Sequence, residues 1–147
     1  MRTKTRVLII DDEEIVRRGF SRILAGGDHY VETAGSGDEA LQEMETHPFD
    51  VVLLDLRMPG MDGMQVLKTI KNRWPDCEVI VVTGYATIET AKEAIRVGAN
   101  NYLAKPTDPE DVIRVTGEAM NHKYWALRRE SQYDISAAAS AKIASAN

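Results

Sequence analysis

The sequence is poor in several features that mark whole classes of protein. It has one cysteine, Cys77, among 147 residues, so no disulfide can form within the chain and nothing indicates an oxidising compartment. Aromatic residues make up only 6% of it, and no apolar run approaches the length that crosses a bilayer. Basic residues are not in excess either, since 18 Lys and Arg stand against 23 Asp and Glu, a net charge of -5. We therefore expect a cytoplasmic protein that neither enters membranes nor binds nucleic acid directly through this segment.

The length sets the number of domains. A chain of 147 residues is long enough for one α/β domain and too short for two ordinary ones. The basic start, Met1 to Arg6, is followed by only four aliphatic residues, which is too short for a signal peptide. We expect the domain to occupy residues 1–122, a helical extension or linker to occupy 123–135, and an Ala/Ser-rich, disordered tail to occupy 136–147.

Strand and helix patterns alternate along the chain. Strands are expected at five short β-branched or apolar runs, 7–10, 30–34, 51–54, 78–82 and 101–104. Helical spacing follows each of them. In the fourth helix we expect four apolar residues to face inward, Ile88, Ala91, Ala94 and Ile95. The last helix begins at Asp108-Pro109 and could run to about Arg129. Five such units predict an α/β fold with a parallel sheet, doubly wound by helices on both faces.

One stretch organises the rest. Residues 51–54 are all aliphatic and end on Asp55, and a turn follows at Pro59-Gly60. A run of this kind suits a parallel strand buried on both faces, and it would deliver Asp55 to the carboxyl end of the sheet, where such folds place their chemistry. The simpler interpretation is that Asp55 only satisfies backbone groups of the turn. The stretch by itself favours neither interpretation.

Other polar residues at strand ends decide between them. Asp11 and Asp12 follow the first strand, Thr83 ends the fourth and Lys105 follows the fifth. If the first and third strands are neighbours, each pair of carboxylates about 5 Å apart costs roughly 3 kcal/mol at an effective dielectric near 20, so a cation is needed. An all-oxygen set suits Mg²⁺ rather than zinc. With a hydroxyl and an ammonium beside it, the group predicts a phosphoryl site with Asp55 as nucleophile.

These residues also carry a resemblance. Asp11-Asp12, the segment from Asp55 to Gly63, Thr83-Gly84 and the segment from Tyr102 to Pro106 resemble the receiver domains of two-component response regulators. The likeness covers about 6–122 and is strongest to receivers that precede AAA+ enhancer-binding transcription activators. It implies a flavodoxin-like sheet of strand order 2-1-3-4-5. It also implies a switch in transcriptional control that is driven by a histidine kinase or phosphotransfer protein. The domain would not be an enzyme, since it would catalyse only its own phosphotransfer and slow autodephosphorylation.

The resemblance implies a role for each motif residue. Asp55 would accept the phosphoryl group, and Thr83 and Lys105 would contact it. The Mg²⁺ ligands would be Asp12, Asp55, the main-chain carbonyl of Arg57 and, through water, Asp11.

The same likeness implies further roles for four residues. Tyr102 would turn inward in the active state, Arg57 and Tyr85 would tune the lifetime of the phosphorylated form, and the bond before Pro106 would be cis. The face built from the fourth helix, fifth strand and last helix would respond, and it could form a homodimer or dock a linker.

Two other classes of function remain open at this level. A hydrolase with an aspartyl-phosphate intermediate, as in the haloacid dehalogenase superfamily, would place its nucleophile after the first strand and a second Asp two residues later, whereas Asp55 follows the third strand and Arg57 stands in that second position. A receiver that is never phosphorylated would not need the complete acidic set. The histidines, His29, His47 and His122, lie singly near element ends and are interpreted as surface or hydrogen-bonding residues.

Overall fold

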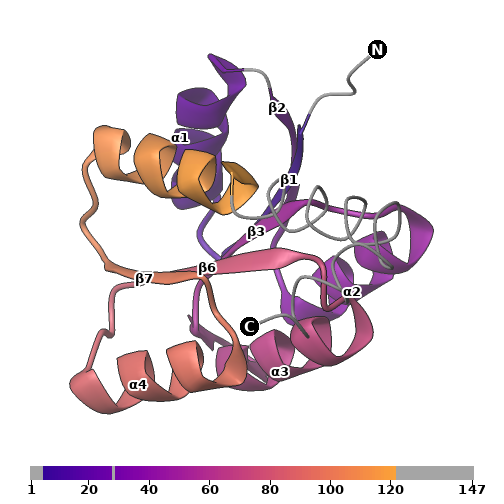
Figure 1. Ribbon diagram of the computed structural model, residues 1–147, viewed down its shortest axis with the longest axis vertical. Helices are drawn as coiled ribbons and strands as arrows, with labels where there is room; N and C mark the ends of the chain where they lie inside the picture. The colour runs from indigo at the N-terminus through magenta and orange to yellow at the C-terminus, as the bar shows by residue number, and fades with distance from the viewer. Residues whose placement is uncertain (1–4, 28, 122–147) are drawn as a thin grey trace, which may run out of the picture.

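The computed structural model describes residues 5–27 and 29–121 of the chain. Its centre is a parallel sheet of five strands in the order β2-β1-β3-β6-β7 (Figure 1). These strands are β1 (Thr5–Ile10), β2 (His29–Ala34), β3 (Val51–Leu54), β6 (Glu78–Thr83) and β7 (Asn101–Ala104). Counted along the chain without the small hairpin described below, the order is the expected 2-1-3-4-5. The predicted parallel sheet and its strand order are therefore confirmed.

Helices cover both faces of this sheet. On one face lie α1 (Glu14–Ala25) and an unlabelled helix, residues 109–121, drawn in orange in Figure 1. On the other lie α2 (Gly37–Thr46), α3 (Gly63–Arg73) and α4 (Ile88–Val97) (Figure 1). Two apolar clusters of buried side chains fill the spaces between these layers. β3 contributes to both, because Val52 and Leu54 point to the first cluster and Val51 and Leu53 to the second.

Local sequence signals set where the helices begin and end. The Ser36 hydroxyl accepts a hydrogen bond from the Glu39 N–H at the start of α2, and the Asp62 carboxylate accepts one from Met64 at the start of α3. Gly98 ends α4 with a φ of 123°, a conformation that favours glycine. The caps of α2 and α3 lie near the carboxyl edge of the sheet, where these helices follow their strands, whereas Gly98 leads the chain back to the amino end of β7.

Two predicted inward positions are wrong. Ile88 and Ile95 on α4 are exposed. The spacing of seven residues puts Ile88 and Ile95 on one line along α4, about 100° around the helix from the buried Ala94. Since α4 buries only the stripe that contains Ala94, its isoleucines remain in solvent.

The loop after β3 holds a short antiparallel hairpin where the sequence predicts only a turn. It pairs β4 (Arg57–Met58) with β5 (Met61–Asp62), and Gly60 between them has a φ of 84°. Gly63, the residue that follows β5, lies so close to the backbone of Leu56 that a Cβ atom added to it would overlap that backbone. The hairpin therefore packs tightly above the end of β3.

The expected linker and tail, 123–135 and 136–147, lie outside the described residues. Within 5–27 and 29–121, no helix is both long and apolar enough to cross a membrane.

Candidate functional site

The register of the sheet brings two aspartates together. In the β1–β3 pairing Ile10 lies opposite Leu54, so the residues that follow, Asp11 and Asp55, emerge side by side at the carboxyl edge. The Asp55 N–H continues the ladder by donating to the Ile10 carbonyl over 3.0 Å. Both side chains are almost completely buried, with Asp11 2% and Asp55 5% exposed. The predicted convergence of the first and third strands is confirmed.

Lys105 joins them from β7. Thr83 lies opposite Ala104 in the β6–β7 pairing, and the Lys105 N–H donates to the Thr83 carbonyl over 2.9 Å. This register aims the lysine side chain across the end of the sheet. Its ammonium donates to Asp11 Oδ2 over 2.6 Å and to Asp55 Oδ2 over 3.1 Å. One cation therefore bridges two buried carboxylates that come from residues far apart in the sequence.

Asp12 completes an acidic cluster. One carboxylate oxygen from each of Asp11, Asp12 and Asp55 lies within 4.8 Å of the others. The remaining oxygens of the two buried aspartates are oriented by backbone groups, since Asp11 Oδ1 accepts from the Glu13 N–H and Asp55 Oδ1 from the Arg57 N–H. Asp12 is exposed. The cluster is thus rigid on its inner side and open to solvent on its outer side.

The charges of this cluster are incompletely balanced. Burial raises the pKa of Asp11 above its ordinary value, outweighing the hydrogen bond from Lys105, and the neighbouring charge of Asp55 adds to the rise. For Lys105, burial would lower the pKa, but hydrogen bonds to Asp11 and Asp55 outweigh it and raise the pKa. Three carboxylates stand against one ammonium, so the site has room for further positive charge.

A cavity of about 380 Å³ opens over the cluster. Across its rim the Arg57 guanidinium lies over the Tyr85 ring, 4.0 Å from the ring centroid. Both residues of this stack line the same cavity as Asp55. The cavity is lined by Asp12, Glu13, Asp55, Arg57, Met58, Pro59, Gly84, Tyr85 and Lys105.

Thr83 is not among the residues that line this cavity. It is completely buried, and its hydroxyl accepts a hydrogen bond from the Tyr85 N–H over 3.2 Å. Its side chain borders a second hollow of about 400 Å³ between α3 and α4, which Thr90 also lines. Lys105-Pro106 is a cis peptide bond, as the resemblance implies.

One partner of Tyr102 was not predicted from the sequence. The phenol oxygen lies 2.7 Å from the Thr90 hydroxyl oxygen on α4. Thr90 also completes a capping box with Thr87 at the start of that helix. The Thr-x-x-Thr spacing is a signal for the cap, but nothing in the sequence indicates that Tyr102 reaches it.

The set of groups defines a class of chemistry. Carboxylates, an ammonium and a cavity at the carboxyl edge of a doubly wound sheet are the kinds of group that hold hard divalent cations and phosphoryl oxygens in proteins. The fold and this site together are those of a signalling receiver domain.

Comparison with known proteins gives the family. The chain belongs to the response regulator receiver domain family, whose profile matches residues 7–116. It is 39% identical over 114 residues to the DNA-binding transcriptional regulator NtrC of Klebsiella pneumoniae, covering 78% of this chain and 24% of that protein. It is 41% identical over 116 residues to the regulatory protein AtoC of Escherichia coli, covering 78% of this chain and 25% of that protein. The chain thus spans about a quarter of the length of these curated relatives.

Solved structures agree with this assignment. A CheY-like receiver domain protein from Methanospirillum hungatei superposes with a TM-score of 0.81 at 29% identity, covering 84% of this chain and 98% of that one. NtrX from Brucella abortus, solved in complex with ADP, superposes with a TM-score of 0.80 at 32% identity, covering 88% of this chain and 29% of that one. The expected likeness to receivers of transcriptional regulators is therefore confirmed.

Proposed function

We propose that this domain is a phosphorylation-dependent switch in which Asp55 accepts a phosphoryl group from a histidine kinase or a phosphotransfer protein. The observation that carries the proposal is the environment of the Asp55 carboxylate, which lines the 380 Å³ cavity and accepts a hydrogen bond from Lys105. It is the carboxylate of the acidic cluster that combines burial, access to a cavity and a neighbouring cation.

The transfer itself needs little covalent chemistry from the protein. A carboxylate oxygen of Asp55 attacks phosphorus, the bond between phosphorus and the donor atom breaks, and the donor leaves with the electron pair. The product is an acyl phosphate. Lys105 remains beside the new group as a positive charge, because its ammonium is already within 3.1 Å of Asp55. Thr83 would contribute its hydroxyl once that hydroxyl turns from the Tyr85 N–H toward the cavity.

Mg²⁺ fits the donor set. The three ligand oxygens of Asp11, Asp12 and Asp55 lie within 4.8 Å of one another, and they are hard donors on an edge that admits water. Asp12, Asp55 and the Arg57 carbonyl would hold the ion directly, and Asp11 would hold it through water. When bound, Mg²⁺ supplies positive charge that offsets repulsion between the carboxylates and phosphoryl oxygens.

A movement of Thr83 would be passed on to the surface of the domain through Tyr102. A Thr83 side chain that moves toward the phosphoryl group vacates space, and Tyr102 would turn into it, giving up its hydrogen bond with Thr90. This motion would alter the face formed by α4, β7 and the helix 109–121. Ile88 and Ile95, exposed on α4, are apolar contacts that a second copy of the domain or an output segment could cover.

The likeness to NtrC and AtoC supports a role in transcriptional control for the protein to which this domain belongs. In that role the domain would not bind nucleic acid itself, and its face of α4, β7 and 109–121 would act on the output part or on a second receiver.

The proposal is tested by incubating the full chain with acetyl phosphate in Mg²⁺ and measuring the intact mass. We expect a gain of one phosphoryl group that disappears in EDTA and in an Asp55→Asn variant. Equal labelling of that variant would sink the assignment of Asp55. Sustained release of phosphate from simple phosphomonoesters would favour the hydrolase alternative instead.

A further inference from the structure

A second group of metal-ligating side chains lies away from the carboxyl edge of the sheet, beside the edge strand β2. It consists of Glu32 on β2, Glu43 on α2, and His47, the residue that ends α2. No ligand role is predicted for His47 from the sequence, because the histidines are scattered singly along the chain. The structure brings this one against two carboxylates from different elements.

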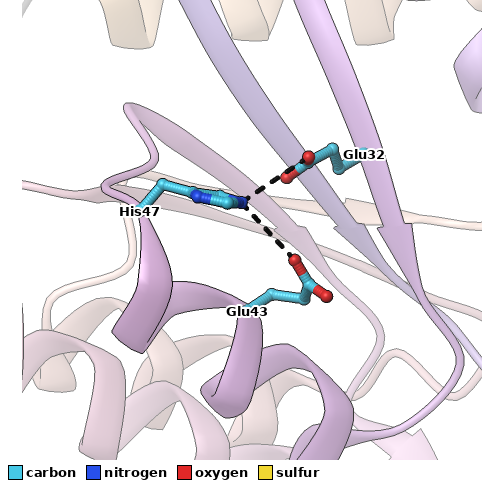
Figure 2. A group of neighbouring side chains, drawn as sticks. All are labelled: Glu32, Glu43 and His47. Carbon is cyan, nitrogen blue, oxygen red and sulfur yellow. Dashed lines mark ion pairs between the residues drawn. The ribbon is translucent and has the colours of Figure 1, made fainter.

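Figure 2 shows the imidazole of His47 pointing between the two glutamates. Its Nε2 lies 3.8 Å from Glu32 Oε1 and 3.7 Å from Glu43 Oε2. The three candidate ligand atoms all lie within 4.8 Å of one another. Glu43 and His47 are four residues apart, so the last turn of α2 presents both on the same side, while Glu32 approaches from the sheet.

The placement of Glu32 explains why this spot needs positive charge. Glu32 lies opposite Leu8 in the β1–β2 pairing, and Ala34, two residues further along β2, points to the same side of the sheet. Both neighbours are buried in the apolar cluster that faces α2. The Glu32 side chain is only 25% exposed, so its carboxylate is partly desolvated on a mainly apolar face.

Arg6 meets only part of that need. Its Nη2 lies 3.6 Å from Glu32 Oε2, beyond hydrogen-bonding distance, and that oxygen is buried with no hydrogen-bond partner among the described residues. The guanidinium is held instead over the rings of Tyr30 and Phe49, 4.7 and 5.4 Å from their centroids. Two carboxylates and one guanidinium leave one negative charge beside the His47 ring.

We propose that Glu32, Glu43 and His47 bind a divalent transition-metal ion of the Zn²⁺ class. One imidazole nitrogen and two carboxylate oxygens make a three-residue ligand set that leaves a position for water. Tetrahedral bonds of about 2.0–2.1 Å place ligand atoms roughly 3.3–3.5 Å apart. The two imidazole–carboxylate separations, 3.7 and 3.8 Å, need to close by only a few tenths of an ångström, whereas the two carboxylate oxygens, which lie within 4.8 Å of each other, need to close by at most about 1.5 Å. The rings of Phe49 and His47 form a T-shaped pair, with 6.1 Å between their centroids.

The two clusters of the domain would then select different ions. The oxygen-only cluster of Asp11, Asp12 and Asp55 suits Mg²⁺, whereas the imidazole at the β2–α2 cluster favours a softer ion. A metal at Glu32, Glu43 and His47 would tie the edge strand to the end of α2. Because it would bind the folded state only, it would raise the thermal midpoint of unfolding.

The test is a titration of the full chain with Co²⁺, whose visible absorption reports coordination, followed by competition with Zn²⁺. An Asp12→Asn, Asp55→Asn background in excess Mg²⁺ removes the acidic edge as a competing site. We expect one equivalent of metal to bind, shift the imidazole resonances of His47 and raise the unfolding midpoint. His47→Gln and Glu43→Gln should each weaken binding by about tenfold or more.

Glu45→Gln is the matched control, because Glu45 lies on the same helix but pairs with Arg73 at 2.8 Å, outside the cluster. It should leave the metal affinity unchanged. Circular dichroism of each variant without metal checks that it is folded. Absence of binding at one equivalent, or binding that His47→Gln leaves intact, would overturn the proposal.

Discussion

Lys105 makes its shorter hydrogen bond, 2.6 Å, with Asp11 rather than with Asp55, which lies 3.1 Å away. The lysine is therefore the counter-ion of both buried carboxylates and not only a partner of the proposed phosphoacceptor. Mg²⁺ would bring positive charge to the same carboxylates. Lysine and metal should therefore act partly as substitutes for each other.

Replacing Lys105 with Met should destabilise the domain most when metal is absent. Asp11 and Asp55 would then be buried like charges without a cation, a change that costs about 3 kcal/mol. Mg²⁺ should restore part of the loss, and the variant should bind Mg²⁺ more tightly than the wild type. Urea denaturation in EDTA and in Mg²⁺ measures both effects.

Lys68→Met serves as the control for this experiment. Lys68 pairs with Glu93 at 3.4 Å on the surface, where such pairs contribute roughly 0–1 kcal/mol. An equal loss for Lys105→Met with and without Mg²⁺ would contradict the idea that the two cations compensate for each other.

The raised pKa of Lys105 predicts a pH dependence in EDTA. A lysine whose pKa is higher in the folded state contributes stability that is fully present below its unfolded pKa, near 10.5, and is lost as the pH rises through the folded value. The stability difference between wild type and Lys105→Met should therefore be constant near neutral pH and shrink above about pH 10.5. Denaturation at a series of alkaline pH values checks this, and a difference that grows above that pH would count against it.

The stack of Arg57 on Tyr85 should control the lifetime of phosphorylated Asp55. Tyr85→Ala removes the aromatic surface at the rim of the cavity, and water should then reach the acyl phosphate more easily. An exposed cation–π contact is worth about 0.5–1 kcal/mol, so hydrolysis should accelerate roughly two- to fivefold. The decay of the phosphorylated mass after donor removal measures this rate.

Arg57→Ala and the double variant complete a cycle. If the two side chains act as one lid, the double variant should be no faster than the faster single variant. If the increase in hydrolysis rate of the double variant is instead the product of the two single increases, each residue acts alone.

The convergence of Asp11, Asp55 and Lys105 was predictable because it follows from topology. Parallel strands end at the same edge of a sheet, and short polar segments after buried apolar runs mark those ends. Strand order and register then place the side chains with little freedom. The positions of these three residues can therefore be predicted from the sequence pattern without knowing how the side chains pack.

What the pattern does not determine depends on contacts between distant residues. The exposure of Ile88 and Ile95 reflects how much of α4 touches the sheet, which helical spacing alone does not give. The direction of the Thr83 hydroxyl and the approach of His47 to Glu32 depend on rotamers chosen by neighbours from other elements. Sequence spacing locates such residues but not their partners.

Gly63→Ala should destabilise the domain strongly. The added Cβ would overlap the backbone of Leu56, which cannot move as a flexible side chain could, so the β4–β5 hairpin would have to shift. Overpacking of this kind costs about 1–3 kcal/mol. Gly19→Ala on α1 is the control, since a Cβ added there would meet nothing within 4 Å and helix propensity predicts a gain of about 0.5–1 kcal/mol. Denaturant midpoints of both variants, measured together, separate the two outcomes.

Tyr102→Phe should shift the conformational equilibrium of the domain toward the conformation that we propose for the phosphorylated form. The hydrogen bond between Tyr102 and Thr90, 2.7 Å between oxygens, joins β7 to α4, and the proposed inward turn of the ring must break it. Losing a bond worth about 1 kcal/mol should lower the stability of the unphosphorylated form by that amount and raise the affinity for the phosphoryl analogue beryllofluoride about fivefold. Titrations followed by amide NMR measure the affinity.

Thr90→Val removes the same bond and should produce a change of the same sign, and the double variant should add little to either single one. Unchanged affinity in Tyr102→Phe would mean that this bond does not restrain the switch.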